Sequence, residues 1–142
     1  MNKQEIMEIL PHRDAMLLVE ELNAADGVAY GKYTVRGDEW FLQGHFPGNP
    51  VVPGVVLCEM MAQCAAILLA GEGTEEEKKG FTPFLTGLNN VKFRKNVLPG
   101  DTLETECSIV KSKKPFYFAT GKGYVDGKLC VNADFSFAVM KV

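Results

Sequence analysis

A long apolar run in the middle of the chain, residues 51–70, constrains the fold more than any other feature of the sequence. Its only charged or amide side chains are Glu59 and Gln63, and Pro53 lies near its start, where proline favours the first turn of a helix. We therefore predict a helix over about 54–71, and the polar residues in it argue against a membrane span. A helix that is apolar nearly all round must be wrapped by a strongly curved sheet or partly covered by a second copy of the chain.

The second half of the chain has the alternating apolar and polar pattern of antiparallel strands. The pair Asp126 and Gly127, between two such runs, is the clearest hairpin signal. The predicted elements are a short helix over 1–10, a strand over 27–35, a helical turn over 39–42 and strands over 84–93, 101–111, 115–125 and 128–140. The polar residues 71–80 are expected to form the most mobile loop. The sequence thus predicts one α+β domain over residues 1–142, with one long central helix wrapped by a curved antiparallel sheet of about five or six strands.

Composition and charge argue against several classes of protein. A chain of 142 residues is long enough for one domain with a sizeable core, and its formal net charge of -3 does not predict nucleic-acid binding. The N-terminal sequence has no secretory signal pattern, so we expect a cytoplasmic protein without membrane insertion. The four cysteines form no Cys-x-x-Cys pair and are expected to be buried, reduced thiols. The sequence has no cluster of acidic and histidine residues around His45 and Glu59, so we expect no metal site.

His45 and Glu59 are the best candidates for acid–base chemistry. His45, one of only two histidines, lies in a loop rich in glycine and proline that leads into the long helix. Imidazole can take up a proton near neutral pH, whereas an isolated carboxyl on an apolar helix must be paired, protonated or line a cavity. Burial would raise the pKa of Glu59 and suit this residue to proton donation. The alternatives are a histidine with a structural hydrogen bond and a glutamate that faces solvent.

The start of the long helix is a candidate anion site. The N–H groups of Gly54 and Val55 lack intrahelical partners there, and the helix dipole is positive at this end. These amides can hold a developing oxyanion, or they can be capped by loop groups as at an ordinary helix start. Cys58 has no paired base that would make it a nucleophile. His12, which follows a proline at a predicted helix exit, is expected to be structural.

Lys92, Arg94 and Lys95 form a basic segment in a chain that is acidic overall. Lys92 and Arg94 alternate with apolar residues, so they share one face of the predicted strand. Such residues usually form a solvated face. Their alternative role is a docking patch for an acidic partner.

Four segments resemble the (3R)-hydroxyacyl-acyl-carrier-protein dehydratases of bacterial fatty acid synthesis. They are LPHRDAMLLVEEL at 10–22, GHFPGNPVVPGVVLCEMMAQ at 44–63, VKFRKNVLPGDTL at 91–103 and VDGK at 125–128. The similarity extends over nearly the whole chain in the same order. It implies a hot-dog fold, in which a curved antiparallel sheet wraps a long helix, and this agrees with the pattern-based prediction. It also implies homodimers, commonly assembled as trimers of dimers, with active sites at the dimer interface.

The resemblance assigns a role to each candidate residue. It implies that His45 removes the proton next to the thioester carbonyl and that Glu59 of the opposite subunit protonates the departing 3-hydroxyl. The amide of Gly54, assisted by Val55, holds the carbonyl oxygen. The candidates for the acyl tunnel are Phe46, Met60, Met61, Phe84 and Phe93. No cofactor is implied, because the substrate is carried on the phosphopantetheine arm of acyl carrier protein, an acidic partner for Lys92, Arg94 and Lys95.

The chain departs from the usual family pattern at two places, and its acidic position narrows the subfamily. Asp14 and Ala15 stand where an aromatic residue and a proline are common, and Phe84 stands where a tyrosine is common; both changes concern the preferred chain length. Glutamate at position 59 favours a general dehydratase over the related group that also isomerises trans-2 to cis-3 double bonds, although some glutamate-bearing members isomerise as well. The other readings are a hot-dog acyl thioesterase and a silent acyl-binding or assembly subunit. A histidine ahead of the helix disfavours the thioesterase, and retention of both His45 and Glu59 disfavours the silent subunit.

Overall fold

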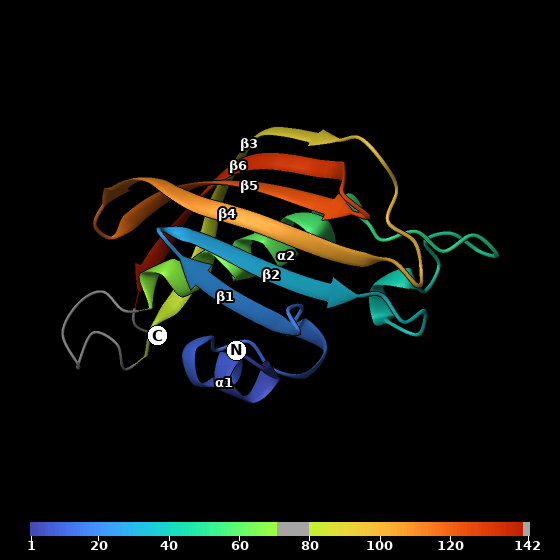
Figure 1. Cartoon of the computed structure of the whole chain (residues 1–142), viewed down its shortest axis with the longest axis horizontal. Coiled ribbons are helices and arrows are strands. Elements are labelled where there is room, and N and C mark those ends of the chain that lie inside the picture. Colours follow the sequence, from blue (N-terminus) through green and yellow to red (C-terminus); the bar gives the residue numbers. More distant parts are fainter. Residues whose placement is uncertain (71–79, 141–142) are drawn as a thin grey trace.

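The computed structural model describes residues 1–70 and 80–140. Six antiparallel strands form one sheet in the order β1-β2-β4-β5-β6-β3, and this curved sheet wraps around the central helix α2 (Figure 1). The helices and strands are α1 Lys3–Ile9, β1 Glu21–Ala25, β2 Val28–Thr34, α2 Gly54–Ala66, β3 Thr82–Phe93, β4 Thr102–Lys113, β5 Phe116–Val125 and β6 Lys128–Met140. The predicted α+β class, central helix and number of strands are confirmed.

Helix α2 is buried on nearly every face, as its apolar sequence predicts. Pro53 precedes it at the N-cap position, with φ of -57°, and its carbonyl oxygen accepts from the amide of Val56. The buried side chains are Val56, Leu57, Cys58, Met60, Met61, Ala62, Gln63, Cys64, Ala65 and Ala66. Val55, which is 71% exposed, and the half-buried Glu59 are one turn apart and mark the open face of the helix. Within the described residues no helix is long and apolar enough to cross a membrane.

The C-terminal end of α2 differs slightly from the prediction. The α-helix ends at Ala66, and a 3-10 turn over Ile67–Leu69 follows it. Since 3-10 geometry commonly tightens a final helical turn, this turn accounts for the rest of the apolar run. The predicted helix end near Gly71 and the predicted mobile loop over 71–80 lie outside the described residues, except for Gly80.

Strand β1 was not predicted from the sequence. Only Leu22 among its five residues is buried, so the strand carries no apolar alternation. It pairs with β2 through a tight turn at Asp26 and Gly27, whose φ angles are 52° and 79°. The confirmed hairpin between β5 and β6 turns in the same way, with φ of 50° at Asp126 and 76° at Gly127. An aspartate–glycine pair favours this turn at both places, and it is the signal that could have located β1.

Strand β3 forms one edge of the sheet and is unusually apolar for an exposed edge. Among the described strands it pairs only with β6. Phe84, Leu85, Leu88 and Phe93 on this strand are each more than a third exposed. Proteins usually protect such an edge with charges or cover it, because unpaired N–H and C=O groups together with apolar side chains attract another chain. The edge along β3 is therefore a candidate contact surface for a second copy.

A buried carboxylate fixes the segment that leads to His45. Glu39 accepts hydrogen bonds from the hydroxyl of Tyr33 at 2.9 Å and from the amides of Arg36 and Gly37 at 2.9 and 2.8 Å. Burial alone would raise the pKa of Glu39, but these hydrogen bonds outweigh it and lower the pKa. The charged carboxylate thereby ties the end of β2 to the predicted helical turn, a 3-10 turn over Trp40–Leu42.

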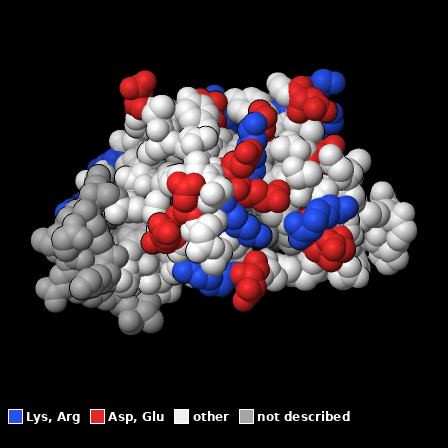
Figure 2. Space-filling model, turned by 60° about the horizontal axis from the view of Figure 1, so that its bottom comes forward, with Lys and Arg blue, Asp and Glu red and all other residues white. Residues whose placement is uncertain are grey.

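The surface charges are mixed in sign. Figure 2 shows acidic and basic side chains interspersed on the face that it presents. An exposed ion pair between Lys32 and Glu104, with 3.6 Å between nitrogen and oxygen, joins β2 to β4. Because both partners are exposed, this pair contributes little to stability.

Candidate active site

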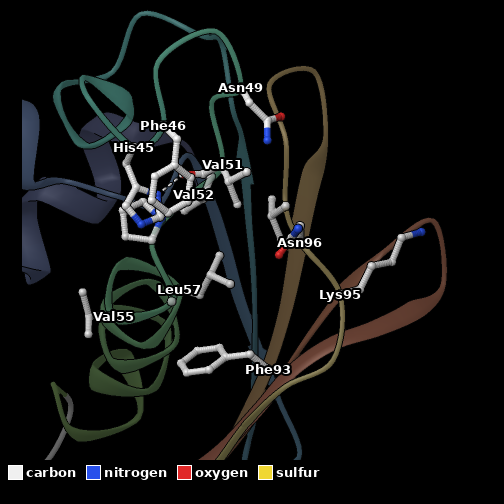
Figure 3. Close-up of a pocket in the computed structure, with 13 residues that line it drawn as sticks. His45, Phe46, Asn49, Val51, Val52, Val55, Leu57, Phe93, Lys95 and Asn96 are labelled. Carbon is white, nitrogen blue, oxygen red and sulfur yellow. Dashed lines mark hydrogen bonds between the residues drawn. The ribbon is translucent and has the colours of Figure 1, made fainter.

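The loop before α2 holds the imidazole of His45 in one orientation. The amide of Val51 donates to the carbonyl oxygen of His45 at 2.8 Å, and Nδ1 of His45 lies 2.8 Å from the carbonyl oxygen of Val51. Because a carbonyl oxygen only accepts, Nδ1 carries the proton of the neutral ring and Nε2 keeps its lone pair. The ring of Phe46 stacks on the imidazole with centroids 4.1 Å apart (Figure 3). The loop therefore presents Nε2 as a base.

His45 opens into a cavity of about 490 Å³. The cavity lies between the histidine loop, the start of α2 and the segment that follows β3 (Figure 3). The lining residues that bear on function are His45, Phe46, Gly54, Val55, Phe93 and Lys95. Its volume is within the range of small-molecule sites, and its wall is apolar apart from a few polar groups, as such sites usually are.

The start of α2 supplies two amides to this cavity. Within the described residues no acceptor bonds the N–H groups of Gly54 and Val55, and Pro53 offers no side-chain cap. Gly54 also lies close to the ring of Phe93, since a Cβ there would be 2.6 Å from Cζ of Phe93 and would force the ring to shift. Gly54 and Val55 begin α2 and line the cavity, so the positive end of the helix dipole lies at the cavity wall. An anionic oxygen is the group that this arrangement can stabilise.

Glu59 lines a different and much smaller cavity, of about 30 Å³. That cavity is lined by His12, Glu59, Ala62, Gln63, Pro83, Leu85 and Phe137. None of these residues lines the His45 cavity. Burial raises the pKa of Glu59, and a hydrogen bond from Gln63, at 3.4 Å, partly offsets this rise. The environment thus favours the protonated carboxyl, as a proton donor requires.

Gln63 is a site residue that the sequence reasoning missed. Its side chain is buried, accepts from the amide of Leu18 at 2.9 Å and donates to the carbonyl oxygen of Met16 at 2.8 Å. The same Nε2 reaches Glu59 one helical turn earlier. Gln63 therefore joins the loop before β1 to the carboxyl of Glu59. An amide four residues after a carboxyl in an apolar helix is the signal that could have indicated this role.

The remaining candidates divide between the cavities, the core and the surface. Phe46 and Phe93 line the His45 cavity, but Met60 and Met61 are buried in the core and line neither cavity. Phe84 also lines neither, because alternation along β3 puts Pro83 and Leu85 on the face that reaches the Glu59 cavity and Phe84 on the other. The structure thus does not support Met60, Met61 or Phe84 as lining residues of either cavity. The two methionines are absent from the cavity linings because they pack into the core from α2, and Phe84 is absent because it points to the other face of β3.

The basic segment lies beside the His45 cavity. Lys92, Arg94 and Lys95 are exposed, and Lys95 lines the cavity. Nε of Arg94 donates to Oδ1 of Asn132 at 2.9 Å.

Burial raises the pKa of the Cys58 thiol, and the charge of Glu59 raises it further, so a thiolate nucleophile is disfavoured. In the described part of the chain no group of three His, Cys, Asp or Glu side chains could hold a metal ion.

Comparison with known proteins decides the family. The family model of the FabA-like domain matches residues 10–134. The chain belongs to the FabA-like family. Curated relatives support this: the 3-hydroxyacyl-acyl-carrier-protein dehydratase FabZ of Clostridium perfringens is 46% identical over 142 residues, covering 98% of this chain and 99% of the relative. FabZ of Fusobacterium nucleatum is 40% identical over 138 residues, covering 95% of this chain and 94% of the relative.

Solved structures agree on the fold. The dehydratase heterocomplex ApeI:P from Xenorhabdus doucetiae matches with a TM-score of 0.80 at 22% identity, covering 96% of this chain and 91% of the other. A thioesterase from Haemophilus influenzae matches with a TM-score of 0.64 at 14% identity, covering 87% of this chain and 78% of the other. At these identities the likeness shows the hot-dog fold alone. Membership of the FabA-like family confirms the resemblance stated from the sequence and the predicted enzyme class, a hydro-lyase.

Proposed function

We propose that this FabA-like protein dehydrates (3R)-hydroxyacyl-acyl-carrier-protein to trans-2-enoyl-acyl-carrier-protein in fatty acid elongation. One observation carries the proposal: His45, whose Nδ1 is engaged by Val51 so that Nε2 is left as the base, lines the same cavity as Gly54 and Val55, whose amides have no partner among the described residues. A base beside an oxyanion site is what proton abstraction next to a thioester carbonyl requires. The names of the FabZ relatives point to the same substrate.

The proposed chemistry is an elimination of water in which the protein side chains transfer only protons. Nε2 of His45 takes a proton from the carbon next to the carbonyl, and the amide of Gly54 stabilises the negative charge on the carbonyl oxygen. The protonated carboxyl of Glu59 gives its proton to the 3-hydroxyl, the carbon–oxygen bond breaks, and water leaves as the double bond forms. Proton transfer from the imidazolium to the carboxylate, through solvent, then restores both groups. Because no electrons are exchanged with the protein, the reaction needs no cofactor beyond the arm that carries the substrate.

We infer that each active site combines residues from two subunits. The cavities of His45 and Glu59 share no lining residue, and they meet β3 near its opposite ends, at Phe93 and Leu85. Leu85 pairs with Phe137 and Phe93 with Val131, six positions apart on β6, which is about 20 Å along an extended strand. Antiparallel pairing of the exposed β3 edge with that of a second copy would bring the end of one strand beside the beginning of the other. That pairing would place His45 of one subunit near Glu59 of its partner.

The basic segment at the end of β3 is the proposed docking surface for acyl carrier protein. Lys95 lies at the wall of the His45 cavity, and Lys92 and Arg94 are exposed close by in the sequence. An acidic carrier bound there would deliver its prosthetic arm directly into the cavity. A trimer of dimers and a cytoplasmic location stay predictions from the sequence.

The direct test is to incubate the protein with a 3-hydroxyacyl thioester and to follow both the enoyl absorbance and the release of free thiol. The proposal predicts an enoyl product without free thiol. Release of thiol without an enoyl product would overturn the dehydratase in favour of a hot-dog thioesterase. Chromatographic separation of trans-2 and cis-3 products in the same samples decides whether the protein also isomerises.

A further inference from the structure

The small cavity beside Glu59 contains a histidine that the proposed reaction does not use. His12 lines this cavity of about 30 Å³ together with Glu59 and Gln63. Nδ1 of His12 is buried and has no hydrogen-bond partner among the described residues. Buried polar atoms are normally hydrogen-bonded, and a nitrogen that no protein group bonds is usually bonded by water. His12 was expected from its position after Pro11 to be structural, and that role leaves this nitrogen without a partner among the described residues.

The loop that carries His12 is held firmly. The guanidinium of Arg13 donates to the carbonyl oxygens of Met7 at 2.8 Å and of Leu10 and His12 at 2.7 Å each. These bonds fix the backbone of His12 relative to the end of α1. Burial lowers the pKa of His12, and the charge of Arg13 lowers it further. The imidazole is therefore neutral at physiological pH, and its Nδ1 can accept or donate one hydrogen bond.

The cavity has the size and the polar groups that one water molecule needs. About 10–15 Å³ is enough for a water, provided that two to four polar partners surround it. Nδ1 of His12 and the carboxyl of Glu59 are available as partners. The amide nitrogen of Gln63 is already engaged with Met16 and Glu59. The apolar remainder of the lining, Ala62, Pro83, Leu85 and Phe137, leaves no other polar side chain to take this place.

We propose that His12 is a positioning residue for Glu59, acting through one water molecule bound between the two side chains. This inference rests on the proposed function, in which Glu59 is the acid. The water would hold the carboxyl in the rotamer that reaches the substrate and would partly solvate its charged form. The titratable side chains around Glu59 are then His12 in the loop and Cys58 on α2, with His45 of the partner subunit across the interface.

Steady-state kinetics on acyl-carrier-protein substrate test the proposal with three variants. His12→Leu keeps the volume but removes the nitrogen, and we expect kcat to fall about tenfold or more, with KM nearly unchanged. The alkaline limb of the kcat–pH profile should move to higher pH, because a drier cavity disfavours the carboxylate. His12→Asn, whose amide can occupy the position of Nδ1, should restore kcat. Ala62→Val fills the cavity with His12 in place and should reproduce the loss.

Several results would overturn the proposal. Wild-type kcat and pH profile in both His12→Leu and Ala62→Val would exclude a role for the water, and an equal loss in His12→Asn and His12→Leu would indicate a purely structural imidazole. Glu59→Gln in the same assay separates this inference from the proposed function. If Glu59→Gln retains activity, the assigned acid is wrong. If it abolishes activity while the His12 and Ala62 variants do not differ from wild type, only the water-mediated role fails.

A high-resolution crystal structure of the wild-type protein should show one water bonded to Nδ1 of His12 and to Glu59. A protein donor or acceptor in its place would contradict the proposal independently of any variant.

Discussion

Gln63 gives the sharpest prediction, because one buried side chain serves both the fold and the acid. In Gln63→Leu the volume is nearly kept, but the amide of Leu18 and the carbonyl oxygen of Met16 lose their partners. Each unsatisfied buried backbone group costs about 1–3 kcal/mol, so the free energy of unfolding should fall by about 3 kcal/mol. For a domain of this size that corresponds to a loss of about 10 °C in the thermal midpoint at fixed protein concentration.

The same change has a separate effect on catalysis. Gln63 donates to the carboxyl of Glu59, and this bond lowers the pKa that burial raises. Without it the pKa of Glu59 rises further, so the group stays protonated to higher pH. Because Glu59 must be protonated to act as an acid, the alkaline limb of the kcat–pH profile should move to higher pH. The value of kcat should also fall, since the carboxyl is no longer held in place.

Calorimetry and a kcat–pH series on the same preparations check both effects. Gln43→Leu is the matched control, since it removes an exposed amide and should change the free energy of unfolding by less than about 0.5 kcal/mol. The control should leave the pH profile unchanged. An alkaline limb that stays in place or moves to lower pH in Gln63→Leu, while the thermal midpoint falls, would refute the assignment of that limb to Glu59.

Three further predictions concern the other parts of the site. Gly54→Ala should lower kcat/KM, because its Cβ would lie 2.6 Å from the ring of Phe93 and force a shift at the oxyanion site; unchanged kinetics would show that the ring moves freely. Glu39→Gln should lower the urea midpoint at pH 7, and this effect should fade as the pH falls below the ordinary glutamate pKa of about 4.3 and through the lowered pKa of Glu39, because a carboxylate of lowered pKa stabilises the fold only while it is charged; a penalty independent of pH would contradict the role of the charge. Arg94→Glu should raise KM for the carrier-protein substrate but not for a pantetheine thioester, and equal effects on both would exclude a docking role.

Local patterns were enough to predict the helix and most of the sheet. Pro53 and the apolar run located α2, and aspartate–glycine turns mark two of the hairpins. Strand β1 was missed because it buries one side chain only, and tertiary pairing with β2 decides its conformation. The need to cover a helix that is apolar nearly all round predicted a curved sheet wrapped around it, and the family resemblance identified this arrangement as the hot-dog fold.

The site was harder to predict, since it depends on contacts between distant parts of the chain. Gln63 bonds Leu18 and Met16, which lie more than forty positions earlier, and no local pattern shows this. An all-round apolar helix also does not reveal which of its residues face a cavity, so Met60 was assigned to the tunnel although it is in the core. His45 and Glu59 could be singled out because the chain has only two histidines and Glu59 is the only acidic residue in α2.

Subunit mixing tests the central claim, an active site shared between two subunits, most directly. His45→Ala and Glu59→Gln should each lose about a hundredfold or more in rate as homodimers. After random exchange, half of the symmetric dimers are mixed and each has one intact site, so the mixture should recover about a quarter of the wild-type rate. Mass spectrometry of differently tagged chains shows that exchange has occurred. Recovery to about that level supports the shared site, whereas no recovery with exchange complete would contradict it.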